Sequence, residues 1–326
     1  SIRPRRVGVA SRTVRNAVSA VGVEMATDVG AKNPNLLLGI GAGFLGVFGF
    51  ASMLVVGRLG ATSDALTIYD LAGLRHAASA LVAIPLMIRF WPRKLSIGQH
   101  FVLAVFAGPP FILLLFFGMT LAPASHAAIV LNGTLPLATA IVGWLWYRQS
   151  PLRWQALGIL VAGAGVAIVG WDALAFGVPG QWRGHLFFLG AALSVAIWYG
   201  AIRYWGLSAT EAILGTVIIS AIFYVPLWLL FLPSGIATAP MDDILLQAAI
   251  LGVWGVMIGG YSQAYCARVL GPIAIAAIMS AGPALATLMA IPVLNEIPSA
   301  LAIIGVIVVT TGVLLVVASG ISSQSR

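Results

Sequence analysis

The chain has 326 residues, of which 60% are hydrophobic and only 8% carry a charge, where a soluble domain would carry about 25%. Because this shortage of charge runs along the whole length, composition excludes a separate water-soluble catalytic or nucleic-acid-binding domain. The sequence therefore indicates an integral membrane protein. A single cysteine, Cys266, excludes an internal disulfide and a cysteine metal cluster.

Residues 1–34 differ from the rest of the chain because five arginines precede the first acidic residue, Glu24. A secretory signal needs a longer apolar run directly after its basic start than this segment contains. The segment is therefore predicted to be a basic tail, with an arginine-rich organelle transit peptide as the alternative.

Beyond Pro34 the hydropathy separates into ten apolar stretches, each near the roughly 20 residues that cross a bilayer. The stretches are 36–56, 66–88, 99–118, 123–146, 154–171, 184–204, 211–232, 245–266, 272–293 and 300–318. The second stretch holds Asp70, Arg75 and His76, and charge near the bilayer centre is costly. Nine spans is therefore the alternative count.

The distribution of cations favours ten spans with both ends in the cytoplasm. With the tail placed inside, 14 of the 17 lysines and arginines fall on the cytoplasmic side, whereas Arg58 and Arg183 fall outside and Arg75 lies within a span. Cytoplasmic connections of membrane proteins carry an excess of lysine and arginine. A nine-span count would scramble this asymmetry, so ten spans is the better prediction.

The chain repeats itself at an offset of 147 to 149 residues. The P-x6-G-x6-G spacing that begins at Pro151 recurs from Pro298, and the pattern from Pro123 to Gly133 recurs from Pro272 to Gly282. Two units of five spans follow, and an odd number of spans places the second unit upside down in the bilayer. The predicted fold is all-α and integral to the membrane, with ten transmembrane helices as two inverted five-helix repeats. The expected units are residues 35–171 and 172–320, followed by a cytoplasmic C-terminus at 321–326.

Four local features, taken with this layout, point to a known family. They are Arg75 in the second span, Leu-Ala-Pro-Ala-Ser-His-Ala-Ala at 121–128 before the fourth, Asn295-Glu296 after the ninth, and glycine-rich fifth and tenth spans. Together they resemble the EamA-type drug/metabolite transporters over about residues 36–318. The resemblance implies a ten-helix membrane transporter and says almost nothing of its substrate. Family members usually carry a second glutamate after the fourth span, and residues 147–149 hold none.

Polar and aromatic residues on three spans are candidates for a substrate site between the two halves. Asn132 on the fourth span needs a hydrogen-bond partner in hydrocarbon, and either a neighbouring helix or a central site would supply one. Trp198 and Tyr199 on the sixth span, and Trp254 and Tyr261 on the eighth, lie deeper than the span ends. Such aromatic walls suit an amphipathic or aromatic metabolite, with an interfacial aromatic belt as the alternative.

Ionisable residues within the spans are further candidates, because charge at membrane depth is usually functional. Arg75 either binds an anionic group of the substrate or locks the fold by pairing with a helix carbonyl. Asp70, His76 and His126 are candidates for ion coupling, and His100 is a weaker candidate of the same kind. A lone histidine is more often a packing residue, and the four histidines show no metal-binding spacing.

Two acidic residues and several glycines are expected to be structural. Glu296 precedes the tenth span, and Glu211 starts the seventh, where a negative charge is favoured at a helix N-terminus. Glycines in the fifth and tenth spans allow close contact between helices. They are Gly158, Gly163, Gly165, Gly170, Gly305 and Gly312.

The sequence thus predicts a secondary transporter of a bacterial cytoplasmic (inner) membrane that exports a small organic metabolite, such as an amino acid, by alternating access. A nucleotide-sugar or organic-anion exchanger is the alternative within transport, and a non-transporting scaffold or channel is another. An enzyme is not expected, because no paired acids, Ser-Lys pair or His-metal set is visible, and no phosphate-binding loop indicates ATP hydrolysis. The expected partners are the substrate and the lipid bilayer, without nucleic acid, metal or cofactor, in a monomer or homodimer.

Overall fold

The computed structural model describes residues 34–91, 93–148, 150–270, 275 and 278–324, and these residues form helices and no strand. Nine of the described helices are long and apolar enough to cross a membrane, and a shorter apolar helix covers Gly282–Leu294. The predicted all-α membrane fold is confirmed. Residues 1–33 of the predicted basic tail lie outside the described residues. Residues 272–274, 276 and 277, at the start of the ninth predicted span, also lie outside them.

The first five spans are α2 (Pro34–Ala61), α3 (Ile68–Phe90), α4 (Ile97–Ala107) joined to α5 (Pro109–Leu121), α6 (Ala124–Tyr147) and α7 (Arg153–Ala175). The remaining spans are α8 (Gln181–Trp205), α9 (Ala209–Phe231), α10 (Met241–Gln247) continuing into η1 (Ala248–Gly259) and α11 (Gly260–Leu270), α13 (Gly282–Leu294) and α14 (Ala300–Gln324). The last helix extends beyond the predicted end at 318, into the expected C-terminal segment.

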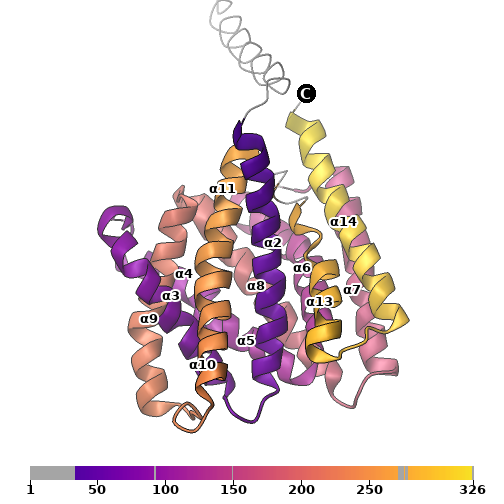
Figure 1. Cartoon of the computed structure of the whole chain (residues 1–326). Coiled ribbons are helices and arrows are strands. Elements are labelled where there is room, and N and C mark those ends of the chain that lie inside the picture. The colour runs from indigo at the N-terminus through magenta and orange to yellow at the C-terminus, as the bar shows by residue number, and fades with distance from the viewer. Residues whose placement is uncertain (1–33, 92, 149, 271–274, 276–277, 325–326) are drawn as a thin grey trace, which may run out of the picture.

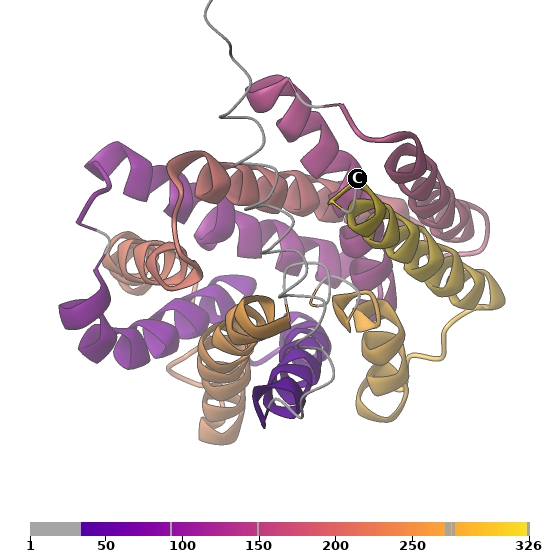
Figure 2. The same ribbon diagram turned by 90° about the horizontal axis from the view of Figure 1, so that it is seen from above.

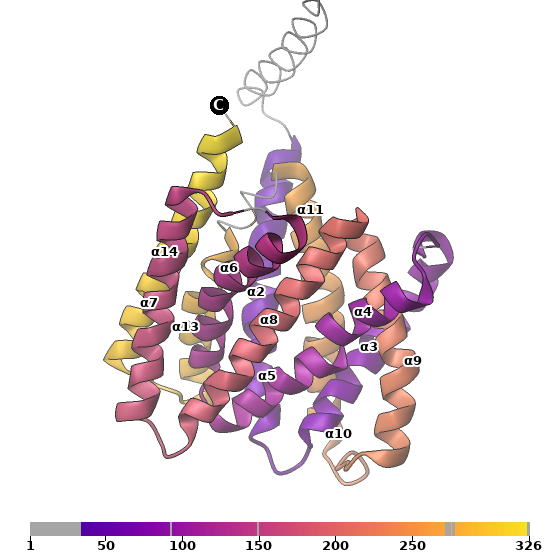
Figure 3. The ribbon, with the colours of Figure 1, turned by 180° about the vertical axis from the view of Figure 1, so that it is seen from behind.

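The helices form one bundle with two ends, shown from the front and from behind in Figures 1 and 3. We call the end where α2 begins and α14 ends the terminal end, and the other, where α2 ends and α3 begins, the opposite end. The connections α7–α8, α9–α10 and α13–α14 all lie at the opposite end, because successive spans alternate in direction.

Two spans are irregular, and they are the third span of each half. Between α4 and α5, Pro109 has no N–H to donate, so the hydrogen-bond ladder is interrupted after Gly108. In the second half, η1 is a π-helical segment of 12 residues, a rare geometry that is often found at functional sites. Neither irregularity was predicted from the sequence.

Corresponding helices of the two halves pack on corresponding neighbours. The first helix of one half, α2, packs on η1, α11 and α13, and the first helix of the other, α8, packs on α4, α5 and α6. The spans α3 and α9 pack on each other, as do α7 and α14. Figure 2 shows the last pair side by side when the bundle is viewed from above. These pairings are those of two inverted repeats related by a two-fold axis.

Glycines of the fifth and tenth spans show the same symmetry at atomic detail. A Cβ added to Gly158 would lie 2.7 Å from the carbonyl oxygen of Gly312, and one added to Gly165 would lie 3.1 Å from that of Gly305. The repeat equates Gly158 with Gly305 and Gly165 with Gly312, so the two-fold axis turns each contact into the other. The close-packing prediction is confirmed for these four glycines.

For Gly163 and Gly170 the packing prediction is wrong. A Cβ added at either position would meet no atom within 4 Å, so these glycines leave open space beside them. The two positions lie on a face of α7 that α14 does not cover. Glycine content alone did not distinguish the two faces of the helix.

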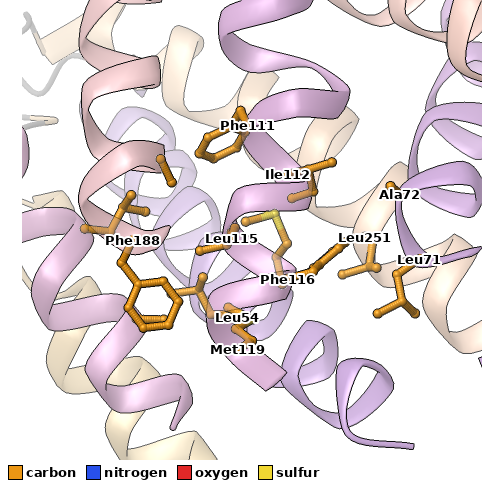
Figure 4. Close-up of a cluster of buried hydrophobic side chains, with 14 of the residues drawn as sticks. Leu54, Leu71, Ala72, Phe111, Ile112, Leu115, Phe116, Met119, Phe188 and Leu251 are labelled. Carbon is orange, nitrogen blue, oxygen red and sulfur yellow. The ribbon is translucent and has the colours of Figure 1, made fainter. Parts of the chain in front are cut away.

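The main hydrophobic cluster surrounds α5 (Figure 4). Phe116, Leu115 and Met119 of α5 are fully buried, with Leu54 of α2 and Phe188 of α8 packed around them. Because α5 ends at the opposite end of the bundle, this cluster lies in that half of the molecule. It draws helices of both repeats together there.

Burial is uneven along the bundle. Residues 70–76 of α3 and 124–131 of α6, at the opposite end, are all buried on every side of the helix. Toward the terminal end most residues of α3 beyond 80 are exposed, and between residues 134 and 146 of α6 only Ala138 and Val142 are buried. In α9 the pattern is reversed, because residues 214–218 near the terminal end are buried and most of residues 221–231 near the opposite end are exposed. Burial therefore differs from helix to helix along the bundle.

Candidate functional site

Arg75 lies on α3 facing the π-helical segment. Its side chain is 8% exposed, and Nη1 donates to the carbonyl oxygen of Leu251 at 3.2 Å and lies 3.0 Å from Sδ of Met53. Its Nε is buried without a hydrogen-bond partner among the described residues. The guanidinium therefore joins three helices, α3, η1 and α2, and keeps one donor unused.

Trp254 lies near Arg75 on the same side of the bundle. Its indole Nε1 donates to the hydroxyl of Ser52 at 3.1 Å, next to Met53 on α2. The ring of Trp254 meets Phe48 edge-on, with 6.1 Å between centroids. Arg75 and Trp254 thus contact two adjacent residues of α2, and we refer to them as the first group.

Trp198 and Tyr261 each contact α9 at different residues, and we refer to them as the second group. Trp198 Nε1 donates to the Thr216 hydroxyl at 3.0 Å, and Tyr261 packs beside Leu214 and Val217 of the same helix. Tyr199 stands next to Trp198, with 5.2 Å between their rings, but 46% of its surface is exposed.

Asn132 is separate from both groups. Its Nδ2 donates to the carbonyl of Ala128 at 2.8 Å, one turn back on its own helix, and the side chain is half-buried. Pro136 lacks the N–H that would pair with the Asn132 carbonyl, so that carbonyl has no regular helical donor. The predicted interhelical hydrogen bond is absent from the described contacts of Asn132.

Asp70 holds the loop between α9 and α10. Its carboxylate accepts from Trp228 Nε1 at 2.7 Å, from the Ser234 hydroxyl at 2.5 Å, and from the backbone N–H groups of Gly235 and Thr67 at 2.9 and 2.8 Å. Four donors on one buried carboxylate are typical of a structural anchor. These contacts give no support to the ion-coupling role predicted for Asp70.

His76 and His100 are buried at different places. His76 lies 5.9 Å, ring to ring, from Tyr224, and its Nε2 has no hydrogen-bond partner among the described residues. His100 stacks on Trp91 at 4.9 Å near the terminal end, and its Nδ1 meets the carbonyl of Ser96.

His126 belongs to a polar cluster at the opposite end, which we call the outer cluster. Its members are His126, Asp172, Gln181, His185 and Ser299. His126 Nδ1 lies 3.1 Å from His185 Nε2 and 3.2 Å from Gln181 Nε2, while its Nε2 lies 3.6 Å from a carboxylate oxygen of Asp172. Ser299 donates to Asp172 at 2.7 Å.

Sequence reasoning found only His126 of this cluster. Gln181 and His185 are four residues apart and so share one face of α8. That spacing is the signal from which a polar site could have been predicted. Among the described residues, no group of histidine, cysteine and acidic side chains could hold a metal ion.

Glu296 was predicted to cap the start of α14, but it caps the start of α6 instead. Its carboxylate accepts from the backbone N–H of Ala124 at 3.0 Å, and so caps α6, while Arg58 pairs with it at 2.7 Å. The start of α14 is capped instead by Ser299, which accepts from the N–H of Ala302 at 2.9 Å. Glu211 caps its own helix, α9, together with Ser208, as predicted.

A pocket of about 570 Å³ opens at the terminal end, between the α3–α4 connection and the start of α9. Its lining residues are Ile88, Arg89, Trp91, Arg93, Lys94 and Glu211. None of the six residues predicted to bind substrate lines it.

Comparisons with known proteins bear on the first half of the chain. Residues 37–171 match the EamA-like transporter family. The resemblance read from the sequence is confirmed over these residues. A match to this family indicates a membrane transporter of small molecules over this part of the chain.

One solved structure, described only as "Crystal structure of protein", is similar to this chain. The similarity covers 86% of this chain and 98% of that one, with 20% sequence identity and a TM-score of 0.56. At this identity the likeness shows the fold alone, and it extends beyond residues 37–171 into the second half. No curated protein matches the chain.

Proposed function

We propose that the chain is a secondary transporter, not an enzyme, that exports a small organic metabolite across a bacterial cytoplasmic membrane. Its two five-helix halves, residues 35–171 and 172–320, would alternate in opening toward each side. The observation that carries this proposal is the match of residues 37–171 to the EamA-like transporter family, in a bundle whose helices pack in the pairs expected of two inverted halves.

The orientation follows from charge. The terminal end carries most of the lysines and arginines, so we place it and both chain termini in the cytoplasm. The buried stretches 70–76 of α3 and 124–131 of α6 then lie on the outer side. The substrate would lie between the halves, among Arg75, Trp254, Trp198, Tyr261, Asn132 and Tyr199.

Reconstituted vesicles test this proposal. Vesicles containing the purified chain would be loaded with amino acids, organic anions or nucleotide sugars, and exchange of labelled substrate would be followed. We expect saturable exchange for one class. A folded protein that exchanges none of them would instead support a scaffold, and a rate that does not saturate would support a channel.

An organic-anion exchanger is the second candidate, and the unused Nε of the buried Arg75 favours it. Arg75→Lys keeps the charge but loses the two-pronged guanidinium that recognises a carboxylate. We expect the KM of an acidic or zwitterionic substrate to rise about tenfold, because a charged hydrogen bond contributes about 1.5–3 kcal/mol. Exchange kinetics in vesicles measure this change.

The control is Arg153→Lys, at an exposed position at the start of α7, which should leave the KM unchanged. If Arg75→Lys lowers thermal stability while the folded fraction transports with the original KM, Arg75 is a structural link between α3 and η1. That outcome would remove Arg75 from the substrate site without affecting the transporter proposal.

A further inference from the structure

The pocket at the terminal end has a basic lining. It lies between the α3–α4 connection and the start of α9, and its volume of about 570 Å³ falls within the roughly 300–1,000 Å³ of ligand pockets. Three cations line it, Arg89, Arg93 and Lys94, against one acid, Glu211. The pocket is thus a concave cationic site, separate from the six candidate substrate residues.

The positive charge of this lining is not neutralised by neighbouring carboxylates. Glu211 Oε2 already accepts from the N–H and the hydroxyl of Ser208, at 2.9 and 2.8 Å, to cap α9. Among the described residues, Arg89, Arg93 and Lys94 form no ion pair within 4 Å. Even with the charge of Glu211 counted in full, two positive charges remain, and such a cleft attracts an anion.

The aromatic wall of the pocket is held in place by its surroundings. Trp91 stacks on His100, with 4.9 Å between ring centroids, and His100 Nδ1 lies 2.9 Å from the carbonyl oxygen of Ser96. Ser96 and Gln99 cap the start of α4, and the N–H of Arg93 donates to the carbonyl of Trp91 at 2.8 Å. The cations that follow Trp91 are therefore carried by a braced turn.

The same pocket borders an apolar surface that faces outward. Ile88 lines the pocket and is 77% exposed, and Leu81 and Ile84 are exposed at positions that share its face of α3. Figures 1 and 3 show the α3–α4 connection at the outer edge of the bundle. Because α3 is a membrane span that ends at Phe90, the pocket lies at the level of the lipid headgroups, and the apolar face leads from it into the hydrocarbon.

We propose that this pocket binds the phosphate headgroup of an anionic phospholipid, whose acyl chains lie along the exposed apolar face of α3. A guanidinium matches a phosphate in geometry, and Arg89 and Arg93 supply two of them. Basic pockets between spans on the cytoplasmic side recognise such headgroups. A soluble phosphate compound could use the same cations, but it would leave the adjoining apolar face unused.

Lipid binding at this pocket does not depend on the proposed transport. Only the choice of the inner leaflet follows from the proposed orientation, in which the terminal end lies in the cytoplasm. The pocket also joins a connection of the first half to a helix of the second, so a lipid bound there would contact both halves.

Native mass spectrometry of the full chain in detergent tests this site. The dissociation constant of the first bound phosphatidylglycerol is compared with that of phosphatidylcholine with the same acyl chains, which carries a phosphate but no net charge. We expect phosphatidylglycerol to bind about 25-fold more tightly. Each cation near an anionic lipid contributes about fivefold in affinity, and two cations remain unneutralised.

Arg93→Gln removes one cation and should weaken phosphatidylglycerol binding about fivefold. The exposed backbone turn that carries Arg93 should tolerate this change. Arg153→Gln is the matched control, because it removes an exposed arginine at the same end of the bundle that does not line the pocket. Its dissociation constants for both lipids should equal those of the unmodified chain.

Glu211→Gln should act in the opposite direction. A glutamine keeps an oxygen that can accept from Ser208 in the helix cap, so α9 should still begin in the same place. Loss of the negative charge should tighten phosphatidylglycerol binding about fivefold. A merely structural role of Glu211 would not produce tighter binding of the lipid.

Equal dissociation constants of the two lipids for the unmodified chain would overturn the proposal. So would equal effects of Arg93→Gln and Arg153→Gln, because general surface charge would then explain the binding. An excess of inorganic phosphate at constant ionic strength that displaces phosphatidylglycerol would show that the pocket takes a soluble phosphate, and the lipid assignment would be wrong. Because no transport is measured, failure of the lipid site and failure of the transporter proposal are distinguishable.

Discussion

Gly158→Leu is expected to prevent stable folding of the bundle. A side chain at this position would enter the backbone of α14, whose Gly312 carbonyl and Val316 N–H both lie 2.7 Å from an added Cβ. Backbone cannot move aside as a flexible side chain can, so the cost should exceed the roughly 1–3 kcal/mol of ordinary overpacking. The yield of monodisperse protein in detergent and its thermal unfolding measure this loss.

Gly163→Leu is the matched control, because it lies on the same helix and an added Cβ meets no atom within 4 Å. We expect it to fold with normal yield. A well-folded Gly158→Leu variant with altered substrate preference would mean that this contact between α7 and α14 belongs to the substrate site.

Asp70→Ala should be the second most damaging change. It leaves Trp228 Nε1, the Ser234 hydroxyl and the Gly235 N–H without their acceptor. Trp228 is buried, and a buried group that loses its partner costs about 1–3 kcal/mol. Ser234 is exposed and Gly235 is half-buried, so water can replace part of their loss, and a total of about 2–4 kcal/mol is expected. The free energy of unfolding and proteolysis of the 232–240 loop measure the effect.

Two further variants separate structure from transport at this position. Asp64→Ala, at an exposed residue of the preceding loop, should have little effect on stability. Asp70→Asn keeps acceptor oxygen but removes the charge, and should fold with a smaller loss. If Asp70→Asn folds normally and loses only the ion dependence of transport, Asp70 is a coupling residue and our structural account of it is wrong.

The sequence was sufficient for features that depend on local chemistry. Hydropathy predicted the spans because hydrocarbon requires long apolar helices. Glu211 predicted a helix start because a negative charge is favoured at a helix N-terminus. The glycine spacing predicted the α7–α14 contact because close helix approach needs small residues at repeated positions.

Features that depend on distant partners could not be predicted. Glu296 caps α6, although it lies 172 residues beyond Ala124, and nothing near it in sequence indicates that target. The π-helical geometry of η1 has no distinct residue pattern in a uniformly apolar segment. The outer cluster combines residues from three helices and one loop, each of which is unremarkable in its own stretch.

The six candidate substrate residues illustrate the same limit. Their residue types were predicted from chemistry alone. In the structure Arg75 and Trp254 contact α2, whereas Trp198 and Tyr261 contact α9. Asn132 donates a hydrogen bond to a carbonyl of its own helix. An asparagine side chain can find such a local partner, so it does not need the neighbouring helix that the sequence analysis offered as a partner.

The reciprocal contacts of α7 and α14 bear on how such a chain could arise. Gly158 lies against Gly312, and Gly165 lies against Gly305. Each of the two helices therefore contributes the same pair of glycine positions to the contact. A half-length ancestor with this one glycine-bearing helix would already be able to join a second copy of itself inserted in the reverse direction. Gene duplication and fusion would then have needed no new surface, only a linker and a bias of positive charge to fix which copy points which way.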